Sequence, residues 1–543
     1  MAPNTVAPAS APKNATAAAA AAAALKKSMA ARAFAQHNNE QSTKLARQIL
    51  NHPAPGFKSV GHAVVVVVYI GINIVLVATN IDKSTVFGAS KRLGWVSLAN
   101  IAFLTFLGLK NTPLAFLTSY SYETLNPLHQ IAGYTTIICA LLHVIFQCVT
   151  FDGFHELEEL IAPEQISGII AAVSMLTILF VALVMKRLRY EVFYVTHVTM
   201  YMLILINVAL HRPDFAKKTV IIPIVAAGMW ICDRILRATR ILWNSRDNRA
   251  TITPLPRGGT RIVLRRSPSR AVPGTHCFLW VPKIRLFESH PFTIVSTSPT
   301  SLELVISAYD GFTHELHEYA VKHPGISLRA SIDGPYGALP SFAKVADKIV
   351  LIAGGSGASF TFGVALDTIK RLEESSKTTI DFVWSVREQD TLTWFSKELN
   401  ELRASPRVNV SIYSTLPAPP ASTGSQTPTS RVEDEKTPDF PISAITPSSN
   451  TQDIPDTDAE KEVGSAKVKA TPWDSTTSLD ITTGRPDVPA IINSIVAGSS
   501  KEERIVIAAC GPLGMMKDVR RSATKAITVS GPSIDLHLEQ FGW

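Results

Sequence analysis

The sequence predicts a membrane protein of several domains: a bundle of six transmembrane helices, an antiparallel β-barrel and an α/β domain with a parallel sheet. The chain has 543 residues, too many for a single hydrophobic core. Only 18% of the residues are charged, and the mean hydropathy of +0.18 is high for a soluble protein. Long apolar segments come first, and shorter strand-like segments broken by glycine and proline follow them.

Residues 1–57 precede the apolar segments and are expected to form a disordered cytosolic tail. They contain no acidic residue before Glu40 and include an alanine run at 17–24, so a mitochondrial presequence is the alternative. The net charge is +8, but the basic residues cluster beside apolar runs, around Arg187–Arg189 and Arg234–Arg246. This distribution is typical of membrane topology signals and excludes a nucleic-acid footprint.

Residues 58–242 are predicted to form the transmembrane domain in the lipid bilayer. Its apolar segments lie near residues 60–80, 96–117, 127–150, 165–186, 190–211 and 218–240. Each approaches the roughly 20 residues that cross a bilayer as a helix. Because basic loops face the cytosol, the basic links after the fourth and sixth segments predict that both termini lie inside.

Two of these segments each carry a pair of histidines with the same spacing. His129 and His143 lie in the third segment, and His197 and His211 lie in the fifth. Fourteen residues of α-helix fall about 40° short of four turns and rise about 21 Å, so each pair shares one helix face. A lone membrane histidine is more often a helix–helix hydrogen bonder, but a repeated offset favours ligands. We therefore expect His129 with His197, and His143 with His211, to bind two b-type haems.

The pattern in the second half of the chain predicts two further domains. Short alternating strands in residues 245–341 predict a small antiparallel barrel, and strands alternating with helices in residues 345–543 predict a parallel sheet. Residues 415–483 interrupt this second domain with a run rich in Pro, Ser and Thr. We expect a disordered insert there, either passive or phosphorylated at its Thr-Pro sites.

Four short motifs in these domains have the composition of ligand-binding turns. The sequence "GFT" at 311–313 begins a predicted helix whose first amides can receive a pyrophosphate. The turns "GGSG" at 354–357 and "CGP" at 510–512 each join a strand to a helix, as phosphate-binding turns do. The cluster "DGPYG" at 333–337 is interpreted as a turn that ends the barrel.

With these motifs in order, the chain resembles the ferric reductase/NADPH oxidase superfamily, and most closely the fungal transmembrane metalloreductases. The resemblance covers residues 58–543 apart from the insert. It is carried by the two histidine pairs and by a series of short motifs. These motifs are "WICDRILR", "HPFTIVS", "GFT", "GPYG", "AGGSG", "VWSVRE", "GRPD", "CGP" and the terminal "FGW".

The resemblance implies roles for individual residues. It assigns to FAD the residues His290, Pro291, Phe292 and Thr293 beside the ring, and Gly311, Phe312 and Thr313 near the pyrophosphate. It assigns to NADPH the residues Gly354, Gly355, Gly357, Cys510, Gly511 and Pro512. Trp543 would cover the flavin face. Arg387 and Arg485 are candidates for the adenosine 2′-phosphate, because guanidinium groups bind phosphate well, although Arg387 could equally form a surface ion pair.

These inferences together predict an NADPH-dependent ferric-chelate reductase in iron or copper assimilation. Electrons would pass from cytosolic NADPH through FAD and two haems to a ferric or cupric chelate across the membrane. The plasma membrane is the expected location, with the endoplasmic reticulum or another internal membrane as the alternative. Two other functions stay open: an NADPH oxidase that makes superoxide from O2, and a haem-binding scaffold with an inactive reductase half. The sequence leaves a partner subunit or a homo-oligomer undecided.

Overall fold

The computed structural model describes residues 43–57, 59–82, 85–113, 122–211, 219–268, 270–337, 339–416, 480–528 and 530–539. Residues 1–42 of the predicted tail at 1–57, the terminal Trp543 and most of the predicted insert lie outside these residues. Residues 43–51 of the tail form a helix, so the predicted disorder does not extend to them. Within the range predicted for the insert, Ile481–Thr483 form strand β11 and pair with β10, so the predicted disorder does not extend to them.

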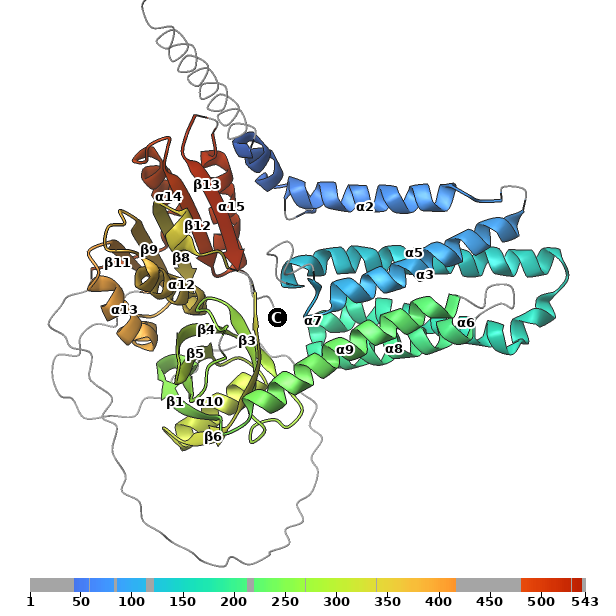
Figure 1. Cartoon of the computed structure of the whole chain (residues 1–543), viewed down its shortest axis with the longest axis horizontal. Coiled ribbons are helices and arrows are strands. Elements are labelled where there is room, and N and C mark those ends of the chain that lie inside the picture. Colours follow the sequence, from blue (N-terminus) through green and yellow to red (C-terminus); the bar gives the residue numbers. More distant parts are fainter. Residues whose placement is uncertain are drawn as a thin grey trace, which may run out of the picture. The chain divides into compact units, whose positions relative to one another are not determined.

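Six long helices are described between residues 60 and 244. They are α2 (Val60–Ala78), α3 (Val86–Gly108), α5 (Tyr122–Gly153), α6 (Pro163–Phe180), α8 (Tyr190–Leu210) and α9 (Ile221–Asn244). A π-helical turn, η2 (Val181–Met185), and the short α7 (Lys186–Leu188) join α6 to α8. In Figure 1, α3, α5, α6, α8 and α9 lie side by side.

Four of the described helices are long and apolar enough to cross a membrane, namely α2, most of α5, α6 continued through α7, and α8. The chain is therefore a membrane protein. The helices α3 and α9 do not meet that criterion. Lys91 and Arg92 lie in the first third of α3, and Arg234, Arg237 and Arg240 lie in the second half of α9. The second predicted segment, 96–117, was wrong in its bounds, because α3 begins at Val86 and the charges of Lys91 and Arg92 had masked its start.

A seven-stranded antiparallel sheet follows the bundle, in the order β6-β1-β2-β5-β4-β3-β7. Its strands are β1 (Arg249–Leu255), β2 (Gly259–Leu264), β3 (His276–Trp280), β4 (His290–Ser298), β5 (Ser301–Ser307), β6 (Ser327–Arg329) and β7 (Ser331–Tyr336). Alternate residues such as Ile252, Ile262 and Leu304 form its core under helix α10 (Phe312–Lys322). Among the described residues no pairing joins the edge strands β6 and β7, so the closed barrel stays a prediction.

The "DGPYG" cluster is a correction to the sequence interpretation. Asp333 to Tyr336 lie within strand β7, which pairs with β3, and do not form a turn. Glycine and proline suggested a turn, but the edge position of β7 tolerates a proline that cannot donate to a ladder.

The last domain is a six-stranded, all-parallel sheet in the order β11-β10-β9-β8-β12-β13. Its strands are β8 (Lys348–Gly354), β9 (Thr379–Val386), β10 (Val408–Ser414), β11 (Ile481–Thr483), β12 (Arg504–Cys510) and β13 (Ser533–Glu539). The intervening helices include α12 (Ala358–Arg371), α13 (Ser396–Arg403), α14 (Val488–Ala497) and α15 (Leu513–Ala526). The predicted parallel α/β arrangement is confirmed.

An ion-pair cluster joins the antiparallel sheet to helix α13 of the last domain. Arg261 of β2 contacts Glu303 at 2.7 Å and Glu398 of α13 at 2.8 Å, and Lys397 contacts Glu303 at 3.0 Å. Burial alone would raise the pKa of Glu303, but the hydrogen bonds and charges of its lysine and arginine partners outweigh it, and the pKa lies below its usual value. The cluster therefore favours the ionised Glu303 carboxylate at the contact between the antiparallel sheet and helix α13.

Candidate functional site

The four predicted histidines face one another in two pairs inside the helix bundle. The ring centres of His129 and His197 are 6.3 Å apart, and those of His143 and His211 are 6.2 Å apart. A bond between a metal and an imidazole nitrogen is about 2 Å long, so two imidazoles on opposite sides of one ion have ring centres roughly 6 Å apart. Both pairs therefore have the spacing of two axial ligands to one ion.

The donor set suits an ion that is already held by a macrocycle. Among the described residues, no group of three or more His, Cys, Asp or Glu side chains is arranged to hold a metal ion. Each histidine pair thus offers two ligands and no more, whereas a bare ion in a protein usually takes four or more. Haem iron needs only the two axial ligands from the protein, so the residues present fit haem.

Hydrogen bonds on the far side of the rings define which nitrogen faces the partner. The Nδ1–H groups of His129, His143 and His211 donate to the carbonyl oxygens of Leu104 (3.1 Å), Ser90 (2.9 Å) and Glu164 (2.7 Å). A carbonyl oxygen can only accept, so each Nδ1 carries the proton and each Nε2 keeps its lone pair for a metal. Such second partners are usual for metal-binding histidines.

On the flavin side, the predicted residues of β4 and α10 come together. The ring of His290 stacks on that of Phe312 with centres 4.5 Å apart and planes 17° apart. Its Nε2 lies 3.0 Å from Glu288, and Phe292 lies 6.3 Å from Phe312 between ring centres. Pro291 and Thr293 occupy the same half-buried stretch of β4.

Helix α10 begins as the sequence predicted, at the "GFT" motif. Gly311 precedes it with φ 70°, a conformation that side chains rarely adopt. The Thr313 hydroxyl accepts a hydrogen bond from the Tyr309 backbone N–H at 2.8 Å and so holds the preceding loop against the helix. The first amides of this 11-residue helix have a glycine rather than a capping side chain before them, an arrangement that suits a pyrophosphate.

The two glycine-rich turns lie at the carboxyl ends of the adjacent strands β8 and β12. A Cβ at Gly354 would lie 2.6 Å from Pro512 Cδ, and one at Gly511 would lie 2.9 Å from the Gly354 nitrogen. A Cβ at Gly357 would overlap the carbonyl group of Cys510. Gly355 has φ 56° and open space where a side chain would be. The turns therefore pack backbone against backbone and leave an open edge, where ligands bind to parallel sheets.

The remaining predicted residues lie along the same edge. Arg387 and Arg485 are exposed. Arg387 directly follows β9, and Arg485 follows β11 after one residue, so they lie on either side of β10. Cys510 is 6% exposed, and burial together with the charge of Glu539 raises its pKa to about 12. Its thiol therefore stays protonated, which disfavours a role as a nucleophile. Trp543, the other predicted residue here, lies outside the described residues.

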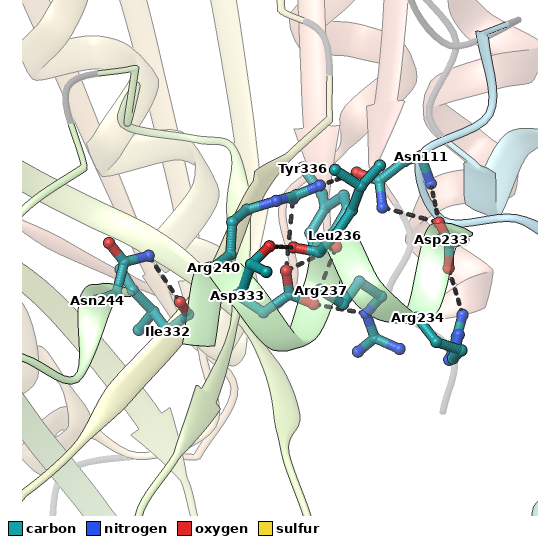
Figure 2. Close-up of polar contacts among 11 residues, drawn as sticks. Asn111, Asp233, Arg234, Leu236, Arg237, Arg240, Asn244, Ile332, Asp333 and Tyr336 are labelled. Carbon is teal, nitrogen blue, oxygen red and sulfur yellow. Dashed lines mark hydrogen bonds and ion pairs between the residues drawn. The ribbon is translucent and has the colours of Figure 1, made fainter. Parts of the chain in front are cut away.

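The sequence interpretation missed the polar junction between α9 and β7, which Figure 2 shows. Asp333 is fully buried, and its carboxylate contacts Arg237 Nε at 2.6 Å and Arg240 Nη1 at 3.4 Å. The Tyr336 hydroxyl donates to both Asp333 oxygens at 2.9 Å. The arginines were visible in "WICDRILR" and in the residues after it, but they read as membrane topology signals.

The same junction reaches the loop after α3. Asp233 accepts hydrogen bonds from the backbone N–H and the side chain of Asn111, at 3.0 and 2.8 Å, and Arg240 donates to the Asn111 side chain. Asn244 at the end of α9 donates to the Ile332 carbonyl at 2.9 Å. One helix of the bundle is thus bonded along its last three turns to strand β7 and to the loop after α3.

Three consecutive stretches of the chain match known families. Residues 93–208 match the ferric reductase like transmembrane component, residues 248–340 match an FAD-binding domain, and residues 346–524 match the ferric reductase NAD binding domain. These stretches contain both glycine-rich turns and three of the four paired histidines, all but His211.

Curated relatives with these domains are fungal. A probable cell surface ferric reductase of Aspergillus oryzae is 26% identical over 58% of this chain and 45% of its own. A ferric/cupric reductase transmembrane component of Schizosaccharomyces pombe is 26% identical over 60% and 66%. A probable ferric reductase transmembrane component of Candida albicans is 23% identical over 83% and 64%.

The chain spans about half to two thirds of the length of these relatives. The matches nevertheless follow one another in a single order and contain three of the four paired histidines, the flavin-side strand and the two glycine-rich turns. The chain thus carries a ferric reductase like transmembrane component, followed by an FAD-binding domain and a ferric reductase NAD binding domain.

Proposed function

We propose that this protein transfers electrons from NADPH on the cytosolic side, through FAD and two b-type haems, to a ferric or cupric chelate on the far side of the membrane. The observation that carries the proposal is the pair of histidine sites in one bundle, with ring centres 6.3 and 6.2 Å apart. Because the paired histidines are fourteen residues apart on each helix, the two sites are separated by about 21 Å along the helix axes.

The cofactors supply the redox chemistry: flavin accepts a hydride and gives up electrons singly, and haem iron carries one electron at a time. The chain supplies binding and orientation. His129 with His197 holds the inner site, and His143 with His211 holds the outer one. The carbonyl partners of three of these imidazoles fix their ring orientation and direct Nε2 toward the site.

In the donor half, the residues bind and align the two nucleotides. The first amides of α10 and the stretch of β4 from His290 to Thr293 receive the flavin. The turns at Gly354–Gly357 and Cys510–Pro512 let a pyrophosphate approach the backbone, since no side chain covers it. Arg387 and Arg485 lie on the same edge and favour NADPH over NADH.

The junction centred on Asp333 aligns the donor half with the bundle. Its bonds run from β7 to the last turns of α9. Strand β7 pairs with β3, which in turn pairs with the flavin-side strand β4. Electron transfer slows steeply with distance, so a rigid connection between the flavin site and the inner histidine pair serves the reaction. This supports a six-helix membrane domain in which α9 crosses the bilayer and ends in the cytosol.

The proposed location is the plasma membrane, with both termini in the cytosol. The basic end of α9 and the basic link at Lys186–Arg189 favour this orientation. The Aspergillus oryzae relative is described as a cell surface ferric reductase, and the Schizosaccharomyces pombe relative as a ferric/cupric reductase. Metal assimilation from outside the cell is consistent with both descriptions.

The test uses the full chain in sealed vesicles with NADPH supplied on the side of the soluble domains. We expect haem absorbance to change on NADPH addition and to return when a ferric chelate is supplied on the opposite side. Superoxide formation in place of chelate reduction would show an oxidase. Absence of any haem change, with FAD bound, would contradict the proposed electron path.

A further inference from the structure

The three carbonyl groups that hold histidine rings share a local sequence feature. In each case the residue four positions after the carbonyl is a glycine. The sets are Leu104 and Gly108 at His129, Ser90 and Gly94 at His143, and Glu164 and Gly168 at His211.

The glycines are needed for the rings to reach these oxygens. In an α-helix, a carbonyl oxygen points toward the residue four positions later, so the side chain at that position lies beside it. A Cβ at Gly168 would lie 2.7 Å from His211 Nδ1, one at Gly94 would lie 3.1 Å from His143 Nδ1, and one at Gly108 would lie 3.3 Å from His129 Cε1. Any larger residue would push the ring away from its acceptor.

The fourth histidine lacks this arrangement. Within the described part of the chain, His197 Nδ1 is buried and has no hydrogen-bond partner. Helices α6 and α8 run antiparallel, because Glu164 at the start of α6 contacts His211 after the end of α8 while α7 joins their other ends. His197 lies fourteen residues before His211, and Ile178 lies fourteen residues after Glu164. Because the helices are antiparallel, Ile178 corresponds to Glu164 at the level of His197.

The position that corresponds to the glycine is therefore Ala182, fourteen residues after Gly168. Ala182 also lies in the π-helical turn η2, and the Ile178 carbonyl accepts a bond from the backbone N–H of Val181, three residues on. The one histidine without an acceptor thus coincides with an alanine in place of glycine and with a break in the regular helix. Single π-turns of this kind are frequent at functional sites.

We propose that Ala182 is a positioning residue that keeps His197 without a hydrogen-bond acceptor. The inner histidine pair then donates less electron density to its haem iron than the outer pair does. This inference rests on the proposed function, in which the pairs bind haem. A carbonyl that accepts from Nδ1–H makes an imidazole more electron-rich and stabilises the oxidised metal. The outer pair has two such bonds and the inner pair has one, so this effect raises the reduction potential of the inner haem relative to that of the outer haem.

The test measures both haem midpoint potentials by spectroscopic redox titration of the purified full chain. Replacing Ala182→Gly removes the side chain beside the Ile178 carbonyl. A carbonyl oxygen has two lone pairs, so it can accept from His197 Nδ1–H in addition to its backbone donor. We expect the reduction equilibrium constant of the inner haem to fall about tenfold, a shift of 59 mV for a one-electron couple, with the outer haem unchanged. Ala182→Ser, which supplies a hydroxyl acceptor and suits a helix better than glycine, should shift the same midpoint downward.

Two further variants identify which midpoint has moved. Gly94→Ala displaces the outer His143 ring and should raise the other midpoint, whereas Gly71→Ala, whose added Cβ meets nothing within 4 Å, should leave both unchanged. Unchanged midpoints in Ala182→Gly and Ala182→Ser, with two low-spin haems bound, would overturn the inference and leave the proposed function intact. If the unmodified chain binds no haem with two histidine ligands, the proposed function fails, and the inference fails with it.

Discussion

Removing the Asp333 carboxylate should destabilise strand β7 far more than removing a carboxylate at the surface. Asp333 is fully buried, and its carboxylate contacts two arginines and one tyrosine. Truncating one partner of such a buried pair leaves uncompensated charge and costs about 3–5 kcal/mol. Glu318 serves as the matched control, because its side chain is 51% exposed and lies 3.7 Å from Lys322. A surface ion pair of this kind contributes at most about 1 kcal/mol to stability.

Cys277 provides a local assay for this effect. It is fully buried in β3, and a Cβ at Gly334 in β7 would lie 3.1 Å from its Cα atom. Its thiol becomes accessible only when this part of the sheet opens, so urea-dependent thiol labelling of Cys277, read by mass spectrometry, reports the local free energy of unfolding. We expect Asp333→Ala to lower this free energy by about 3–5 kcal/mol and Glu318→Ala to change it little. Equal effects of the two variants would refute the buried network.

Three other predictions follow. Replacing Arg387 and Arg485 by alanine should raise the Michaelis constant for NADPH and leave that for NADH nearly unchanged, because only NADPH carries the 2′-phosphate; an equal loss with both would contradict the assignment. Deleting residues 417–479 should leave the rate of NADPH oxidation with ferric chelate near normal, because the entropic cost of loop closure grows slowly with length. Loss of this activity with FAD and haem still bound would contradict the prediction. The pKa of Glu303 lies below its usual 4.5, so its contribution to stability is full above that value and is lost as the pH falls through the lower one. The urea midpoint should therefore fall more steeply below pH 4.5 in the unmodified chain than in Glu303→Gln, and parallel curves would rule this out.

The elements that sequence could predict are those with a strong local period. The apolar helices, the parallel strands and the fourteen-residue histidine spacing each repeat along the chain, and the structure brings the histidines together in the expected pairs. The acceptors of their Nδ1 protons were not predicted, because a backbone carbonyl has no side chain to mark it. The glycine signal was nevertheless present, since Gly94 and Gly108 repeat the spacing of the histidines that they face.

The junction at Asp333 could not be read from sequence for a different reason. The aspartate and the two arginines that bind it are about ninety residues apart or more, and each has an ordinary local explanation, as a turn residue or a topology signal. Only the pairing of β7 with β3 and the length of α9 bring them within bonding distance. Long-range polar contacts of this kind depend on the assembled fold rather than on local pattern.

The most direct test of the central claim is the number of haems bound by each chain. The purified full chain should contain two low-spin haems, and His129→Ala and His143→Ala should each contain one, because each variant removes one ligand from a different pair. NADPH should still reduce the flavin in both variants, since the nucleotide sites lie in the other domains. A single haem in the unmodified chain, or two low-spin haems in either variant, would contradict the account.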